Sequence, residues 1–143
     1  SPSAKQQPKA VSLKGVPVLL AEDNDLNAEI TTMLLEKEGM VVTRAADGEQ
    51  VVEIFKNAPA EAFAVILMDI MMPKLDGYAA AQAIRTLEGR ADGRTIPIIA
   101  LSANVFAEDI EASKAAGMDA HLSKPLEVGK LIATISQLYG RRE

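Results

Sequence analysis

Residues 63–69 read FAVILMD, an unbroken apolar run that ends in an aspartate. A strand with one face in water alternates apolar and polar residues, whereas a strand buried on both faces is apolar throughout. Four further short apolar runs occur, at residues 16–21, 40–43, 96–101 and 120–122. We therefore predict five strands, with residues 63–68 forming one that is covered on both sides.

The stretches between these runs have helical spacing. After the first run, apolar residues stand at i, i+4, i+7 and i+8, namely Leu26, Ile30, Met33 and Leu34, which predicts a helix. Similar spacing predicts further helices around residues 51–55, 78–84, 106–110 and 128–139, and the one near 106–110 has the weakest apolar stripe. Residues 88–95, EGRADGRT, are polar and are expected to form a loop. Alternating strands and helices predict a parallel α/β sheet with helices on both faces.

Composition excludes several classes of protein. The chain has 143 residues with no Cys, one His and a formal net charge of −5. There is thus no disulfide framework, no thiol nucleophile and no centre that needs several His ligands. The acidic balance argues against direct binding to nucleic acid, which needs a dense basic face. No apolar run approaches the roughly 20 residues of a membrane span, and no signal peptide is present. We expect a cytoplasmic domain that makes no membrane contact.

The N-terminal stretch differs in composition from the rest. Residues 1–15, SPSAKQQPKAVSLKG, are rich in Pro, Ser, Lys and Gln, which predicts a linker or disordered tail. The globular domain is expected to cover residues 16–140. Because the first residue is Ser rather than Met, we expect the chain to be a fragment or a processed product.

Polar residues follow the apolar runs. Glu22 and Asp23 follow the first, Asp69 and Ser102 end two others, and Lys124 follows the last. Parallel strands end at the same edge of a sheet, so these side chains are expected to converge there. Three close carboxylates repel one another and need either raised pKa values or a cation. Oxygen ligands favour Mg²⁺ or Mn²⁺ as that cation. A metal, an ammonium and a hydroxyl suit a phosphoryl group, and a carboxylate can accept it as an acyl phosphate.

Four segments together resemble the receiver domain of two-component response regulators. They are VPVLLAEDNDLN, VILMDIMMPKLDGYAAAQAIR, IPIIALSAN and MDAHLSKP, and the resemblance covers about residues 16–140. It implies a flavodoxin-like fold with five parallel strands in the order 2-1-3-4-5. It also implies a cis Lys124-Pro125 bond, for which proline lowers the energetic penalty.

The resemblance assigns a role to each polar residue. Asp69 is then the phosphoacceptor, and Lys124 binds a phosphoryl oxygen. Mg²⁺ is held by Asp23, Asp69, the backbone carbonyl of Met71 and, through a water, Glu22. Ser102 is the switch hydroxyl, and the small Ala103 leaves room for the phosphoryl group. His121 stands where the family usually has an aromatic switch residue.

The function that these roles imply is a phosphorelay domain. It takes a phosphoryl group from the phosphohistidine of a histidine kinase or a histidine phosphotransfer domain, and it loses that group slowly by its own hydrolysis. Whether to class such a self-modifying domain as an enzyme stays open, as does its oligomeric state. AEDN, ALSAN and the N-terminal tail favour the receiver of a hybrid histidine kinase. A stand-alone regulator that acts by binding a protein is the alternative, and a metal-dependent phosphatase is a third candidate.

Overall fold

The structure, a computed structural model, describes residues 12–141 and contains one parallel sheet with the strand order β2-β1-β3-β4-β5. The strands are β1 (Pro17–Ala21), β2 (Val41–Ala45), β3 (Val65–Asp69), β4 (Ile98–Ser102) and β5 (Ala120–Ser123). The helices are α2 (Asp25–Lys37), α3 (Gly48–Asn57), α4 (Gly77–Arg85), α5 (Ala91–Thr95), α6 (Ala107–Ala115) and α7 (Val128–Gly140). The predicted fold class and strand order are confirmed, with strand ends displaced by one or two residues.

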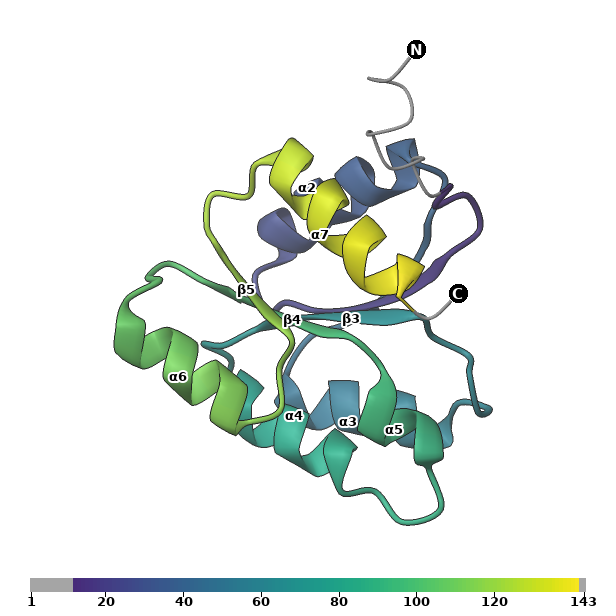
Figure 1. The fold of residues 1–143 in the computed structure, drawn as a ribbon, viewed down its shortest axis with the longest axis vertical. Helices are drawn as coiled ribbons and strands as arrows, with labels where there is room; N and C mark the ends of the chain where they lie inside the picture. The colour runs from purple at the N-terminus through teal and green to yellow at the C-terminus, as the bar shows by residue number, and fades with distance from the viewer. Residues whose placement is uncertain (1–11, 142–143) are drawn as a thin grey trace, which may run out of the picture.

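The sheet lies between two layers of helices (Figure 1). Helices α2 and α7 cover one face, and α3, α4, α5 and α6 cover the other. Successive side chains of a strand point to opposite faces. Accordingly, Val18 and Leu20 pack with α2 and α7, whereas Leu19 and Ala21 pack with α3 and α4. All five residues of β3 are buried, as its continuous apolar sequence predicts.

Helix α2 forms where predicted, but the stripe that identified it faces solvent. Leu26 is 64% exposed, Ile30 47% and Met33 58%. The buried residues of α2 are Ala28, Thr31 and Leu35, which also follow helical spacing. The apolar stripe therefore contributes little to the core of the described chain.

The prediction of a loop over residues 88–95 is wrong for its second half, where residues 91–95 form α5. This short helix depends on tertiary contacts rather than on an apolar stripe. The Arg90 guanidinium donates to both oxygens of the buried Asp92 carboxylate at 3.0 Å, and to the carbonyl of Phe55 at the end of α3 at 2.7 Å. Arg90 thus supplies hydrogen bonds both to a buried carboxylate and to a carbonyl in the last turn of α3, which the helix itself leaves without a partner.

At the N-terminus, residues 1–11 of the predicted linker lie outside the described residues. Leu13 is buried in the core below α2 and α7, so the packed unit includes residues shortly before Val16. Across residues 12–141, no helix is both long enough and apolar enough to cross a membrane.

Candidate functional site

The predicted site residues meet at the carboxyl edge of the sheet. Asp69 is the last residue of β3, and Glu22 and Asp23 follow the neighbouring strand β1. Ser102 ends β4, and Lys124 follows β5. Because all five strands are parallel, residues from distant parts of the chain come together here. The site sits where the strand order switches between β1 and β3, the place where open α/β sheets bind ligands.

Lys124 connects the two buried carboxylates of the site. Its Nζ lies 2.9 Å from Oε1 of Glu22 and 3.0 Å from Oδ2 of Asp69. The remaining oxygens accept from the backbone: Met71 N–H donates to Asp69 Oδ1 at 3.1 Å, and Asn24 N–H donates to Glu22 Oε2 at 3.2 Å. Glu22 is 2% exposed and Asp69 3% exposed. Both carboxylates are thus held in fixed orientations beside one ammonium.

Burial and charge act against each other in this cluster. Burial raises the pKa of Glu22, and the hydrogen bonds from Lys124 and Asn24 only partly offset it. For Lys124, burial alone would lower the pKa, but the hydrogen bonds to Glu22 and Asp69 outweigh burial and leave its pKa raised. The ammonium is therefore firmly charged at neutral pH. The charge of Lys124 alone does not offset the free-energy cost of ionising the Glu22 carboxyl group next to Asp69.

The carboxylates fit a divalent cation. One ligand oxygen from each of Glu22, Asp23 and Asp69 can be chosen so that all lie within 4.8 Å of one another. Such an all-oxygen donor set suits a hard ion such as Mg²⁺. The Met71 side chain is 77% exposed, so it takes no part in the core, whereas its backbone N–H contacts Asp69.

The loop after Asp69 is fixed by a glycine. Gly77 N–H donates to the carbonyl of Ile70 at 2.9 Å, which draws the start of α4 against the end of β3. A Cβ on Gly77 would lie 2.5 Å from the carbonyl oxygen of Asp69. Asp76 caps α4 by accepting from Ala79 N–H at 2.9 Å. The Asp-Gly pair of the sequence therefore holds the loop close to Asp69.

Ser102 and His121 contact each other, and the hydroxyl of Ser102 bonds to His121 and Asn104 rather than to a carboxylate. The Ser102 hydroxyl donates to the carbonyl of Asn104 at 2.5 Å and lies 2.6 Å from Nε2 of His121. The other ring nitrogen of His121 lies 2.8 Å from the hydroxyl of Ser113 in α6. Sequence reasoning missed Ser113, because a serine in a weakly amphipathic helix carries no signal of its orientation. The expected cis Lys124-Pro125 bond is confirmed, and Ala103 is exposed.

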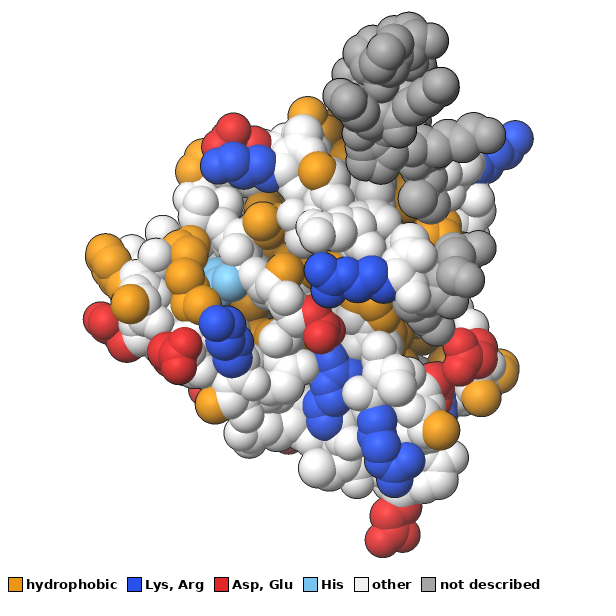
Figure 2. All heavy atoms as spheres, in the orientation of Figure 1, with side chains coloured by type: hydrophobic (Ala, Val, Ile, Leu, Met, Phe, Trp, Pro, Cys, Tyr) orange, Lys and Arg blue, Asp and Glu red, His pale blue; other side chains and the backbone are white. Residues whose placement is uncertain are grey.

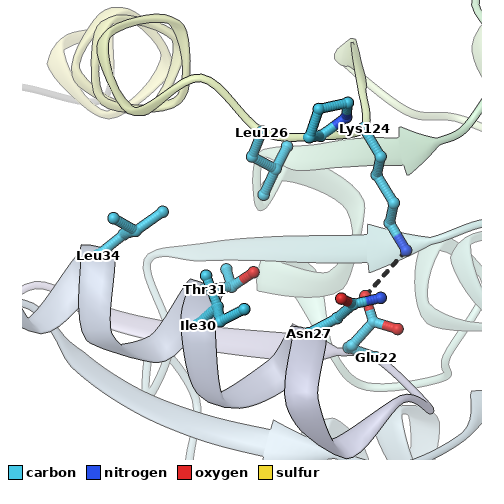
Figure 3. A pocket seen from close by; sticks show the side chains of 8 residues that line it. Glu22, Asn27, Ile30, Thr31, Leu34, Lys124 and Leu126 are labelled. Atoms are coloured by element: carbon cyan, nitrogen blue, oxygen red, sulfur yellow. Dashed lines mark hydrogen bonds and ion pairs between the residues drawn. The ribbon is translucent and has the colours of Figure 1, made fainter.

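A groove of about 420 Å³ runs from the site along α2. Figure 3 shows Ile30 and Leu34 of α2 on one side and Leu126 on the other, with Lys124 reaching Glu22 at one end. Ile30 and Leu34, which form its wall on the α2 side, belong to the apolar stripe of α2 that lies outside the core.

A family model described as the response regulator receiver domain matches residues 18–136. The chain belongs to this receiver domain family. The receiver domain is 39% identical over 122 residues to the peroxide stress-activated histidine kinase mak1 of Schizosaccharomyces pombe, and 35% identical over 157 residues to histidine kinase 1 of Arabidopsis thaliana. These alignments cover 85% and 89% of this chain, but only 7% and 13% of the two kinases. The chain therefore spans a small part of the curated relatives it matches.

Two solved structures resemble this receiver domain, each with a TM-score of 0.78. One is the receiver domain of a sensor histidine kinase from Pseudomonas aeruginosa PAO1, with a magnesium ion coordinated in its active-site cleft; it is 37% identical, covering 88% of this chain and 98% of that one. The other is the receiver domain of Ssk1 from Saccharomyces cerevisiae, in complex with the histidine phosphotransfer protein Ypd1. It is 25% identical, covering 91% of this chain and 92% of that one.

Proposed function

We propose that Asp69 of this receiver domain accepts a phosphoryl group from a phosphohistidine in a reaction that depends on Mg²⁺. The observation that carries the proposal is the placement of the Asp69 carboxylate. It ends the central strand β3, pairs with Lys124 at 3.0 Å and has an oxygen within 4.8 Å of an oxygen of each of two further carboxylates. Three carboxylates and one ammonium at this edge suit phosphoryl transfer, because the ammonium and a cation held by the carboxylates can stabilise the charge of the phosphoryl group.

The transfer breaks one bond and forms one. A carboxylate oxygen of Asp69 attacks the phosphorus, the bond from phosphorus to the donor imidazole nitrogen breaks, and that nitrogen leaves with its electron pair. The product is an acyl phosphate on Asp69 and a free histidine on the donor. Lys124 binds a phosphoryl oxygen and neutralises part of its charge. Hydrolysis of the acyl phosphate by water later restores the carboxylate.

Mg²⁺, for which Mn²⁺ can substitute, fits the oxygen donors of the site. Asp23, Asp69 and the carbonyl of Met71 would hold it directly, and Glu22 would hold it through a water. When bound, the cation supplies positive charge to the phosphoryl oxygens. The magnesium ion in the similar receiver domain from P. aeruginosa supports this assignment.

The phosphohistidine donor is expected to dock by a helix in the groove beside Lys124. Exposed Ile30 and half-buried Leu34 lie next to Leu126 there, which leaves an apolar surface that the core does not use. Helices bind such grooves through their apolar face. The complex of a similar receiver with a histidine phosphotransfer protein supports a donor of this type.

We assign the receiver domain to a larger hybrid histidine kinase in the cytoplasm. Both curated kinases described above contain a segment like this chain as a small part of their length. A stand-alone regulator is the other arrangement, and the reading frame around the coding sequence distinguishes the two.

The experiment that tests the acceptor is mass spectrometry of the intact chain after incubation with acetyl phosphate and Mg²⁺. We expect one phosphoryl group on the wild-type chain and none on Asp69→Asn, which keeps the shape of the side chain but removes the nucleophile. Asp25→Asn is the matched control, because Asp25 begins α2 near the site and pairs with Arg44.

Two results would contradict the proposal. One is a stoichiometric, base-labile phosphoryl group on Asp69→Asn. The other is labelling of the wild-type chain that EDTA does not reduce. Steady turnover of a phosphate ester such as p-nitrophenyl phosphate would indicate a phosphatase instead of an acceptor that reacts once.

A further inference from the structure

Strand β2 sends one long basic side chain toward the loop that carries two of the proposed metal ligands. Glu22 and Asp23 lie between β1 and α2, and Arg44 is on the neighbouring edge strand β2, opposite Leu20. Arg44 Nε and Nη2 both donate to the backbone carbonyl of Glu22, at 2.9 Å and 2.7 Å. That carbonyl belongs to the peptide bond between Glu22 and Asp23. Arg44 therefore contacts the main chain that joins the two acidic residues.

The hydrogen-bonding groups of Glu22 all have partners. Its backbone N–H donates to the carbonyl of Ala45 at 3.1 Å, so β2 holds both the N–H and the carbonyl of this residue. Its side chain accepts from Lys124 and from the N–H of Asn24. These contacts fix the path of the chain where it leaves β1.

Asp23 lacks such support of its own. It is exposed, and no group within residues 12–141 is hydrogen-bonded to its carboxylate. One of its oxygens nevertheless lies within 4.8 Å of an oxygen of Glu22 and of an oxygen of Asp69. The direction in which this carboxylate points therefore depends on the main chain before it, which Arg44 holds.

An ordinary surface ion pair does not explain the placement of Arg44. Charged side chains are spread singly or in small groups over the face of the molecule drawn in Figure 2, and exposed ion pairs contribute little to stability. Arg44 Nη1 donates to Oδ1 of Asp25 at 2.8 Å, but the Asp25 side chain is 94% exposed. The Arg44 side chain is only 29% exposed. Its two charge-assisted hydrogen bonds to the Glu22 carbonyl are therefore its stronger attachment.

The charge of Arg44 opposes the binding of a cation. A guanidinium beside the acidic loop repels Mg²⁺, and the exposed Asp25 carboxylate offsets this repulsion only in part. Charge alone therefore predicts tighter binding of Mg²⁺ when an uncharged residue replaces Arg44. Loss of a positioning contact predicts weaker binding. The sign of the effect thus separates the two roles.

We propose that Arg44 is a positioning residue for the divalent cation, because it holds the peptide between Glu22 and Asp23 so that the Asp23 carboxylate faces the other two. This inference rests on the proposed function, since it takes the carboxylates of Glu22, Asp23 and Asp69 as the Mg²⁺ site. The rigid fork of a guanidinium presents two donors to one carbonyl in a fixed geometry, which an ammonium cannot reproduce. Groups that orient metal ligands contribute to metal affinity without touching the ion.

The test measures the dissociation constant of Mg²⁺ alone by NMR titration of the chain at neutral pH and constant ionic strength. Arg44→Met removes the donors and the charge but keeps a long unbranched side chain, and Arg44→Lys keeps the charge but not the fork. Arg94→Met is the matched control. Arg94 is exposed on α5, which precedes β4 and so lies away from the carboxyl edge of the sheet. Urea unfolding without Mg²⁺ establishes that each variant is folded.

We expect Arg44→Met to bind Mg²⁺ about tenfold more weakly than the wild-type chain, and the affinity of Arg44→Lys to lie between the two. Arg94→Met and Asp25→Asn should stay within about twofold of the wild-type affinity, because both leave the two hydrogen bonds to the Glu22 carbonyl in place. Without Mg²⁺, the carbonyl ¹³C signal of Glu22 should shift in both Arg44 variants and stay unchanged in Arg94→Met.

Three results would overturn this inference and leave the proposed function intact. The first is binding of Mg²⁺ by Arg44→Met that equals or exceeds that of the wild-type chain, which would reduce Arg44 to an electrostatic role. The second is wild-type affinity in Arg44→Lys, a result that stands even where Arg44→Met fails to fold. The third is equal weakening in Arg94→Met, which would make the effect one of net charge. Failure of the wild-type chain to bind Mg²⁺ through its carboxylates would overturn both proposals.

Discussion

The Glu22 carboxyl group lies in a buried environment that disfavours its ionised form. It is 2% exposed, it faces Asp69, and Lys124, the ammonium that its carboxylate contacts within residues 12–141, is shared with that aspartate. Burial raises its pKa above the ordinary value of 4.5. The folded chain therefore binds a proton at Glu22 more tightly than the unfolded chain does.

This raised pKa links the stability of the chain to pH. Between 4.5 and the folded pKa of Glu22, the folded state binds more protons, so the free energy of unfolding contributed by this group falls as pH rises. Glu22→Gln keeps an oxygen that accepts from Lys124 but removes the charge. We expect its stability relative to the wild-type chain to increase as pH rises through that window, by about 1.4 kcal/mol for each unit of pKa difference.

The measurement is urea unfolding at a series of pH values from about 4 to 7 without divalent cations. Glu29→Gln, which removes an exposed carboxylate on α2, controls for the loss of one negative charge. A constant stability difference between Glu22→Gln and the wild-type chain across this range would contradict the prediction.

Single residues differ in how well the sequence predicts their place. Asp69 and Lys124 were predictable because Asp69 stands directly after an apolar run and Lys124 two residues after another. Parallel strands bring such positions to one edge. Ser113 was not predictable in this way. Its role depends on the rotation of α6 about its axis, and the weak apolar stripe of that helix does not fix the rotation.

At the scale of elements, α2 has two apolar faces that serve different purposes. Ala28, Thr31 and Leu35 face the sheet, and the exposed face, with Ile30, borders the groove beside Lys124. Spacing alone identifies the helix but does not choose between two faces with similar periodicity. The small side chains of Ala28 and Thr31 suit the face that lies close to the sheet.

We expect the exposed face of α2 to be needed for binding the protein donor but not for the transfer of the phosphoryl group itself. Ile30→Asp places a charge in the groove and should slow transfer from a phosphorylated histidine phosphotransfer protein by about tenfold or more. Labelling by acetyl phosphate, which needs no docking surface, should stay within about twofold of the wild-type rate.

Val41→Asp is the control, since Val41 lies on the edge strand β2 and is also exposed, at 58%. It should leave both rates unchanged. Equal slowing by Ile30→Asp with acetyl phosphate and with the protein donor would place the effect in the site itself and contradict a docking role.

Helix α5 shows why a short element escaped prediction. Residues 88–95 contain no apolar stripe, and the helix of five residues is held by the contacts of Arg90 with Asp92 and the end of α3. Such contacts join segments about 35 residues apart in the chain. The local sequence pattern of residues 88–95 therefore does not predict these contacts.

At the scale of the whole molecule, the fold gathers residues that the unfolded chain keeps apart. Glu22 and Asp23 follow β1, whereas Asp69 ends β3, and only the pairing of these two strands brings the three carboxylates within 4.8 Å. Their mutual repulsion opposes folding. A cation that binds the gathered carboxylates and not the unfolded chain must therefore stabilise the fold.

We expect Mg²⁺ to raise the free energy of unfolding of the wild-type chain, by about 1.4 kcal/mol when its concentration is ten times the dissociation constant. Asp23→Ala removes a direct ligand and should lose most of this increment. Met71→Ala should keep it, because the proposed ligand is the main-chain carbonyl and the side chain is 77% exposed. Urea unfolding at constant ionic strength, with and without Mg²⁺, separates the three chains. Equal increments in wild type and Asp23→Ala would show that Mg²⁺ acts as a general salt, and equal loss in both variants would place the Met71 side chain in the site.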